Sequence, residues 1–261
     1  KNFWPADIHL IGKDITRFHS VYWPAFLISA GLEIPKTIFS HGFLLNKGEK
    51  ISKSLGNTIN PRELIEHYGV DQLRFYLLSS TPFGNDGNYS HELITSHVNA
   101  NLSNDLGNLS QRCLKMIMDK CDSKIPNIGT LTDVDKDLIK SSSKLYESCL
   151  GSMDSYLINE YIVSVFNLVS STNKYFSSQE PWELSKTNLD RMNTILWVTC
   201  EVLRKAAILL QPVIVEGSNK LLNLLNVDSN KRSFKHLGED FSLVPGSKIN
   251  KAEIIFPKIK P

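Results

Sequence analysis

The sequence predicts a small α/β unit followed by an all-α bundle. Up to about residue 95, short apolar runs alternate with helical patterns, which is typical of a sheet crossed by helices. Farther along, apolar residues recur every three or four positions over long segments with short breaks, which indicates a helical bundle. Composition changes at the same place, because six of the seven histidines lie at or before residue 97, whereas all four cysteines and all four methionines follow it.

The first part contains two predicted strands and two predicted helix starts. Apolar runs at 8–12 and 37–43 are expected to be strands, and residues 46–48 form a candidate hairpin turn. Residues 60–63, Asn-Pro-Arg-Glu, combine a capping residue, a proline at the first helical position and a glutamate two residues later, so we expect a helix there. A second helix is expected from about Val70.

A helix with one apolar stripe is predicted between the two strands. Its members recur at three- and four-residue spacing and are Ile15, Phe18, His19, Tyr22, Trp23, Phe26 and Leu27. Pro24 interrupts the helix interior and is expected to kink it. Two interpretations stay open, a core helix with a hydrogen-bonded buried His19, or the lining of a small apolar pocket with a few polar groups.

Asp14 lies just beyond the carboxyl end of the first predicted strand, where open α/β sheets bind ligands. A carboxylate at this position accepts hydrogen bonds from ribose hydroxyls. The position equally suits a helix cap, so the residue pattern leaves both roles open.

The segment 50–57 has the composition of a phosphate-binding loop. Two lysines and two serines fall within five residues, namely Lys50, Ser52, Lys53 and Ser54. Ammonium and hydroxyl groups donate hydrogen bonds to a polyphosphate and stabilise the negative charge that grows during phosphoryl or nucleotidyl transfer. Composition alone equally fits a solvated surface loop.

The second part is predicted to consist of five long helices and a mixed tail. The helices are expected at 91–119, 134–150, 155–177, 188–210 and 213–226. Asn104, Asn108 and Arg112 are four residues apart, so one helix face presents all three. Amide and guanidinium groups suit hydrogen bonding to base edges, and Trp182 offers a stacking surface for an unpaired base. Alternatively, the three polar residues form an ordinary solvated helix face, and Trp182 packs in the protein interior.

The composition excludes several classes of protein. The 261 residues are 41% hydrophobic and 21% charged, as in a folded globular protein, and no apolar run approaches the roughly 18 residues of a membrane helix. The N-terminal residues have no apolar signal core, so secretion is not indicated. The net charge of +2 excludes a uniformly basic coat, so nucleic-acid contact must be local. The four cysteines lie far apart without a CxxC pair, which fits a reducing compartment and predicts no bound metal.

Several strings resemble known enzymes. Residues 50–54, Lys-Ile-Ser-Lys-Ser, resemble the Lys-Met-Ser-Lys-Ser signature of class I aminoacyl-tRNA synthetases, with Ile51 in place of methionine. Residues 4–15 and 18–25 closely resemble the methionyl-tRNA synthetase family. Further matches occur in order at 69–76, 99–102, 106–112, 180–182 and 256–259, so the resemblance covers the chain from residue 3 to about 225 and touches its end.

The resemblance implies a fold and three domains. We expect the C-terminal part of a Rossmann-like class I catalytic domain at 1–95, with the lysine loop, and a helical-bundle anticodon-binding domain at 96–226. Residues 227–261 are expected to be a C-terminal tail, of which 254–257 docks as a short extended piece.

The resemblance also implies an activity, ATP-dependent formation of methionyl-adenylate and transfer of the methionyl group to tRNA-Met. It assigns catalysis to Lys50 and Lys53, ATP binding to Gly12, Asp14, Leu44, Ser52, Lys53 and Ser54, and methionine binding to Phe18, His19 and Trp23. It assigns anticodon binding to Asn104, Asn108, Arg112 and Trp182. Mg²⁺ is expected to accompany ATP as substrate, without a protein ligand that the sequence identifies. Neither a membrane nor an oligomer is indicated, and the expected location is a bacterial-type cytoplasm or an organellar matrix.

One departure from the family shapes these expectations. The sequence holds no His-Ile-Gly-His motif, begins with Lys1 and has its first methionine at Met116, so we expect a chain that starts after the first half of the catalytic domain. Its sheet is then expected to have an exposed edge and an uncovered apolar surface. The isolated chain is expected to be inactive. A non-catalytic anticodon-binding module and a subunit of a split synthetase, completed by a separate N-terminal half, are the alternatives.

Overall fold

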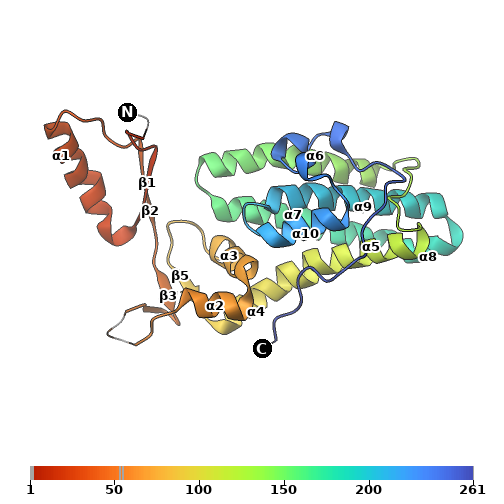
Figure 1. The fold of residues 1–261 in the computed structure, drawn as a ribbon, viewed down its shortest axis with the longest axis horizontal. Coiled ribbons are helices and arrows are strands. Elements are labelled where there is room, and N and C mark those ends of the chain that lie inside the picture. Colours follow the sequence, from red (N-terminus) through yellow and green to blue (C-terminus); the bar gives the residue numbers. More distant parts are fainter. Residues whose placement is uncertain (1–2, 53, 55, 261) are drawn as a thin grey trace.

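The computed structural model describes residues 3–52, 54 and 56–260. As predicted, an α/β part comes first and a helical bundle follows (Figure 1). The first strands and α1 lie to one side of the bundle, which β2 touches through Phe39 and Tyr156, whereas the second small sheet and the helices after it lie against the bundle. Within the described residues, no helix is both long and apolar enough to cross a membrane.

The first sheet is a βαβ unit. β1 (Ile8–Gly12) pairs in parallel with β2 (Thr37–His41), so that Gly12 lies opposite His41. The connection contains a 3₁₀ turn at Lys13–Ile15, a π-helical stretch at Phe18–Tyr22 and α1 (Trp23–Ser29). Both strands confirm the sequence prediction, although the second ends at His41 and not at residue 43.

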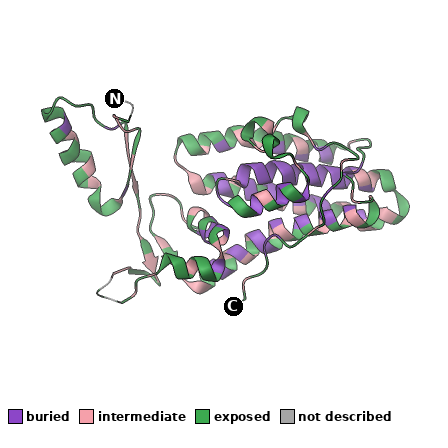
Figure 2. Ribbon diagram, viewed as in Figure 1, coloured by how far each residue is buried: buried purple, intermediate pink, exposed green. Residues whose placement is uncertain are grey.

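The apolar stripe between these strands is mostly exposed. Of its seven members only Leu27 is buried, while Phe18 is 59% and Phe26 66% exposed, and Leu10 on β1 is 61% exposed (Figure 2). The core-helix interpretation is therefore wrong for this chain, and the expected uncovered apolar surface is confirmed. Pro24 does not kink the interior of one α-helix; it lies at the start of α1, where π-helical geometry changes to α-helical geometry.

The second sheet confirms the predicted hairpin. β3 (Leu44–Asn46) pairs antiparallel with β4 (Glu49–Lys50), and Lys47 and Gly48 have φ of 50° and 83°. Two consecutive residues with positive φ form the turn type whose twist matches a two-residue hairpin. A third strand, β5 (Gly87–Tyr89), lies parallel to β3. It was not predicted, because three residues carry too little alternation to indicate a strand.

The link between the two sheets requires a glycine. A Cβ on Gly42 would lie 2.1 Å from the carbonyl oxygen of Asn85 and 2.7 Å from the backbone nitrogen of Asp86. Just beyond, the backbone N–H of Gly87 donates to the carbonyl of Phe43 at 2.8 Å. The two backbones therefore touch at a point where no side chain fits.

Two helices connect the sheets to the bundle. α2 (Pro61–Tyr68) begins as predicted, since the Asn60 side chain accepts from the N–H of Arg62 at 3.1 Å. α3 (Val70–Ser79) follows and also begins where expected. The Asp71 carboxylate accepts from the N–H of Gly217, and Arg74 donates to two backbone carbonyls of the bundle.

The bundle confirms the five predicted helices and adds a short one. One continuous helix comprises α4 (His91–Val98), a π-helical stretch (Asn99–Gly107) and α5 (Asn108–Lys120). The others are α6 (Asp133–Asp154), α7 (Ile158–Gln179), the additional α8 (Pro181–Thr187), α9 (Leu189–Leu210) and α10 (Val215–Leu224). Every residue of α9 from Thr194 onward is buried, so this helix is the centre of the core (Figure 2).

The tail packs on the bundle through short 3₁₀ turns and an extended end. The turns are Ser229–Lys231, Phe234–His236 and Glu239–Phe241. Ile255 and Phe256 are 6% and 4% exposed, which confirms the predicted docking of this segment.

A buried polar network joins three helices at one end of the bundle. The Asp135 carboxylate, in the first turn of α6, accepts from Arg191 of α9 at 2.5 and 2.9 Å and from the hydroxyl of Tyr175 of α7 at 2.6 Å. Burial alone would raise the pKa of Asp135, but these bonds and those from Thr132 lower it to about 2. The stability that the carboxylate contributes is therefore present at neutral pH and is lost as the pH falls from about 4 towards 2.

We predict that Asp135→Ala lowers the free energy of unfolding by about 3–5 kcal/mol at neutral pH, because it leaves the half-buried Arg191 without its counter-ion. Urea denaturation followed by circular dichroism measures this change. Asp133→Ala is the matched control, since Asp133 lies in the same helical turn and its pair with Lys136 is exposed. Equal urea concentrations at the midpoint of unfolding for the two variants would show that the network does not stabilise the bundle.

We predict that Gly42→Ala destabilises the chain by about 1–3 kcal/mol, because the added methyl group forces two touching backbones apart. Thermal unfolding followed by circular dichroism is the measurement. Gly238→Ala serves as the control, since a Cβ there meets no atom within 4 Å and the φ of −65° suits alanine. A Gly42→Ala melting temperature equal to that of the control would contradict the close approach.

Candidate functional site

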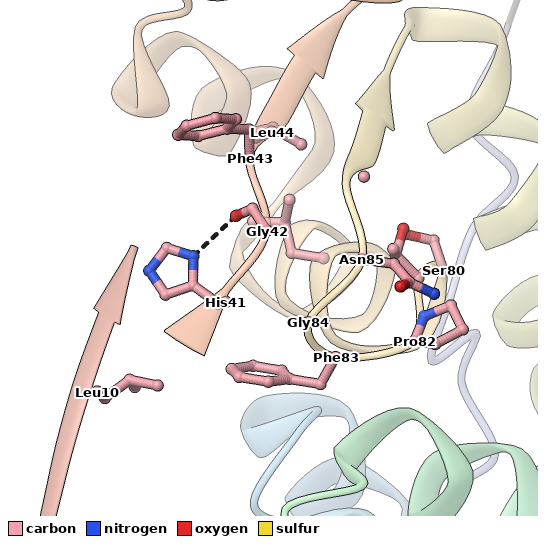
Figure 3. Close-up of a pocket in the computed structure, with 13 residues that line it drawn as sticks. Leu10, His41, Gly42, Phe43, Leu44, Ser80, Pro82, Phe83, Gly84 and Asn85 are labelled. Carbon is pink, nitrogen blue, oxygen red and sulfur yellow. Dashed lines mark hydrogen bonds between the residues drawn. The ribbon is translucent and has the colours of Figure 1, made fainter. Parts of the chain in front are cut away.

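A cavity of about 290 Å³ lies where the two sheets meet. The lining comes from Leu10 of β1, the link 41–44, Leu77 of α3, and residues 80–85 and 87. Figure 3 shows the Phe83 ring beside Leu10 and the Nδ1 of His41 bonded to the carbonyl of Gly42, at 2.8 Å. Leu44, predicted to lie near an adenine, lines this cavity at the start of β3.

Two ammonium groups gather on one aromatic ring beside this cavity. The Nζ atoms of Lys13 and Lys50 lie 4.7 and 4.4 Å from the centroid of the Phe43 ring. Lys13 also forms an ion pair with Asp86 at 2.6 Å, and Asp86 accepts from the N–H of Phe43 at 2.8 Å. The hydrogen bond from Lys13, and then the one from Phe43, lower the pKa of the Asp86 carboxyl. Asp86 compensates the charge of Lys13, so Lys50, which forms no ion pair with a described residue, is the positive charge left to a phosphate beside this cavity.

Of this group, only Lys50 was predicted from the sequence as a site residue, and Lys13, Phe43 and Asp86 were not. Lys13 adjoins the predicted ligand residues Gly12 and Asp14, and its place in the Gly-Lys-Asp string was the one local signal. Phe43 and Asp86 become relevant through contacts between distant segments, which a pattern along the chain does not reveal.

The lysine loop is held by Asn57. Its side-chain oxygen accepts from the N–H of Ser52 at 2.8 Å, and its amide donates to the carbonyl of Lys50 at 3.1 Å. The Asn46 amide in turn donates to the carbonyl of Asn57 at 3.1 Å. The hydroxyls of Ser52 and Ser54 are 2.7 Å apart, so the two predicted hydroxyl donors lie together. The predicted catalytic Lys53 lies outside the described residues.

Asp14 is exposed in the 3₁₀ turn that follows β1. Its carboxylate accepts no hydrogen bond from any other residue that the structure describes, and the cap position of the turn belongs to Gly12 without a side-chain bond. The helix-cap alternative is therefore wrong. Ribose binding by Gly12 and Asp14 stays a prediction.

The residues predicted to bind methionine fall into two separate groups of contacting aromatic rings. His19 and Trp23 join a cluster with Trp4 and His9, with ring centroids 6.1 Å apart for His9 and His19 and 6.2 Å apart for Trp4 and Trp23. Phe18 instead contacts Tyr22, with centroids 5.6 Å apart. The Nδ1 of His19 is bonded to the carbonyl of Ile15 at 3.0 Å, which orients its ring. Trp4 and His9 were not predicted as site residues.

The predicted RNA-binding residues lie on the continuous helix and on α8. Asn104 and Asn108 are exposed on the same helix. Farther along, the Arg112 guanidinium lies 5.3 Å from the Trp182 ring and 5.0 Å from the Phe176 ring. Trp182 is half-buried against Phe176, with centroids 6.2 Å apart, so one part of the indole packs and another part faces solvent. The structure therefore brings Arg112 and Trp182 together, while their binding role stays a prediction.

Among the described residues, no group of three or more His, Cys, Asp or Glu side chains is arranged to hold a metal ion.

Comparisons with known families match both parts of the chain. The model of the class I tRNA synthetases (M) matches residues 1–114, and the model of the anticodon binding domain of methionyl tRNA ligase matches residues 125–261. A methionine–tRNA ligase of Rhizobium meliloti is 50% identical over 98% of this chain, and one of Mycobacterium bovis is 46% identical over 100% of this chain. The chain spans about half the length of these curated relatives.

Solved structures agree with this match. Mycobacterium tuberculosis methionyl-tRNA synthetase in complex with methionyl-adenylate superimposes with a TM-score of 0.94 at 47% identity, covering 98% of this chain and 50% of that one. Its free form gives a TM-score of 0.91 at 44% identity, covering 99% of this chain and 51% of that one. The α/β part and the helical anticodon-binding part thus occur in the same order in both proteins, and the chain belongs to the methionyl-tRNA synthetase family.

Proposed function

We propose that this chain provides the C-terminal half of an ATP-dependent methionine–tRNA ligase. The observation that carries the proposal is the Lys50 ammonium group, which lies on the Phe43 ring beside the cavity that Leu44 lines, with Lys13 held on the same ring by Asp86. A solved relative binds methionyl-adenylate, which is the product of the first step of such a reaction.

The first step is the attack of a methionine carboxylate oxygen on the α-phosphorus of ATP. A new carboxylate–phosphorus bond forms, the bond to the β-phosphate oxygen breaks, and pyrophosphate leaves. Lys50 and Lys53 stabilise the charge that develops on the phosphates, and the hydroxyls of Ser52 and Ser54 add donors. Asp14 accepts from the ribose hydroxyls, with Gly12 beside it, and the adenine lies near Leu44. Mg²⁺ accompanies ATP as part of the substrate.

The methionine side chain binds near Phe18, His19 and Trp23 in this proposal. These residues lie on the exposed stripe, beside an open β1 edge. A half-exposed stripe does not enclose a substrate, so the remaining part of a class I catalytic domain covers it. That N-terminal half is the partner we propose for the α/β part, and its histidine motif supplies the other phosphate contacts.

The second step passes the methionyl group to the 3′-terminal ribose of tRNA-Met. We propose that the bundle selects this tRNA through its CAU anticodon. Asn104, Asn108 and Arg112 bond to base edges, and Trp182 stacks on one base. Only a few placed residues are involved, in keeping with a net charge of +2.

A non-catalytic anticodon-binding module is the second candidate. It is favoured by one observation: the bundle buries its core within these residues, whereas the apolar surface of the α/β part stays uncovered. We place the catalytic part at 1–95, the anticodon-binding domain at 96–226 and the tail at 227–261. A bacterial-type cytoplasm is the location that fits this function.

We predict that the chain alone does not catalyse methionine-dependent ATP–pyrophosphate exchange, and that the co-expressed N-terminal half of the Rhizobium meliloti relative restores it. Lys50→Ala in the restored complex is expected to lower the exchange rate at least about tenfold, because one phosphate-facing charge is lost. Lys144→Ala, on the exposed face of α6, is the control.

Three results would contradict parts of this proposal. Exchange by the chain alone would show that the covering half is not required. An unchanged rate for Lys50→Ala would remove Lys50 from catalysis. A stable complex of the two halves without exchange would favour the non-catalytic module.

We predict that Trp182→Ala weakens binding of a stem-loop with a CAU anticodon by about 1–3 kcal/mol, which is the contribution of one base–aromatic stack. Fluorescence anisotropy at fixed salt measures the dissociation constant. Trp182→Phe keeps an aromatic face and is expected to retain most of the affinity. If the alanine variant binds as tightly as the unchanged chain, Trp182 does not stack on the RNA.

A further inference from the structure

The C-terminal segment is fixed against the continuous helix. It runs back along α5 and ends beside α4 (Figure 1). The Asn99 side chain holds it from both sides, since its amide donates to the carbonyl of Ile259 and its oxygen accepts from the N–H of Ile259, each at 2.9 Å. The ring of Phe256 lies against Gly217, where a Cβ would come within 2.1 Å of it. The segment from Ile254 to Ile259 is therefore fixed on the helix, and we call it the tail wall.

A cavity of about 370 Å³ lies between this tail wall and the continuous helix. Asn104, Asn108 and Gln111 line it from the helix, and Ile254, Pro257 and Lys258 line it from the tail. None of the side chains that line it carries a negative charge. The cavity therefore has amides on one side and a cation with apolar neighbours on the other.

The amide groups on the helix side are available to a ligand. Asn104, Asn108 and Gln111 are exposed, and their side chains make no hydrogen bond to another residue in the described part of the chain. An amide offers both a donor and an acceptor, which is the pattern that the edge of an unpaired base requires. The helix widens here into its π-helical stretch, where a Cβ on Gly107 would lie 2.8 Å from the carbonyl of Leu102. Such widened turns occur often at functional sites.

The tail side offers a charge and an apolar surface. Lys258 is exposed and forms no ion pair with a described residue. Its ammonium is a point charge of the kind that contacts a phosphate. Ile254, which is 61% exposed, and Pro257 provide an apolar rim against which a base face packs.

We propose that this cavity holds one unpaired nucleotide of the anticodon loop, with Gln111 bonded to its base and Lys258 to its phosphate. The tail is then an RNA-binding element and not only a packing segment. This proposal rests on the proposed anticodon recognition and adds two contacts to it.

The test uses the 261-residue chain and a fluorescent stem-loop RNA, with anisotropy titrations at several salt concentrations. Lys258→Ala is expected to weaken binding to CAU and altered loops alike, and to lower the slope of log Kd against log salt concentration by about 0.7–1, because one phosphate contact is lost. Gln111→Ala is expected to weaken binding of the CAU loop by about fivefold or more, and to reduce discrimination against single-base variants of the loop.

Lys260→Ala is the matched control, since Lys260 is an exposed lysine of the same tail that does not line the cavity. It is expected to leave both the affinity and the salt slope nearly unchanged. Equal effects of Lys258→Ala and Lys260→Ala would indicate diffuse charge and would overturn the assigned phosphate contact. Unchanged binding by Gln111→Ala and Lys258→Ala, with Trp182→Ala still weakened, would overturn this proposal alone. No binding of any stem-loop by the unchanged chain would overturn both this proposal and anticodon recognition.

Discussion

The attachment of α3 to the bundle is the constraint on which the relative position of the two parts depends. Arg74 donates to the carbonyls of Pro212 and Val213, in the connection between α9 and α10, and Asp71 accepts from the N–H of Gly217 in the first turn of α10. One short helix thus satisfies two carbonyls of the α9–α10 connection and one N–H in the first turn of α10, where the first N–H groups of a helix lack a partner within the helix. Because α3 also precedes β5, this attachment carries the second sheet, and with it the lysine loop, to a fixed place on the bundle.

Local patterns predicted the elements of this fold well, because their causes are local. The Lys47–Gly48 turn follows from two residues that tolerate positive φ, and the start of α2 follows from the Asn60 cap. The apolar periodicity located the long helices for the same reason. β5 and the crossing at Gly42 were missed, since both exist through contact between segments distant in the chain.

The candidate site was predictable to the same extent. Five consecutive residues of the lysine loop were enough to predict a phosphate-binding segment. The Phe43 ring and Asp86 could not be predicted as site residues, because only the fold brings them to the ammonium groups. The stripe around Trp23 shows a second limit. Periodicity identifies an apolar face without identifying what covers it, and here the described residues leave the face largely exposed.

The two proposed surfaces are connected by continuous structure. The helix from His91 to Lys120 begins beside β5, passes the tail cavity in its π-helical stretch and reaches Arg112, which contacts Trp182.

A second contact between the two parts lies near the first sheet, where Phe39 of β2 stacks on Phe83 and on Tyr156, with both pairs of centroids 4.7 Å apart. Tyr156 belongs to the connection between α6 and α7, so this stack attaches β2 to the bundle without passing through α3. Because two independent contacts fix the α/β part on the bundle, the surface around Asn108 and the lysine loop around Lys50 belong to one packed body.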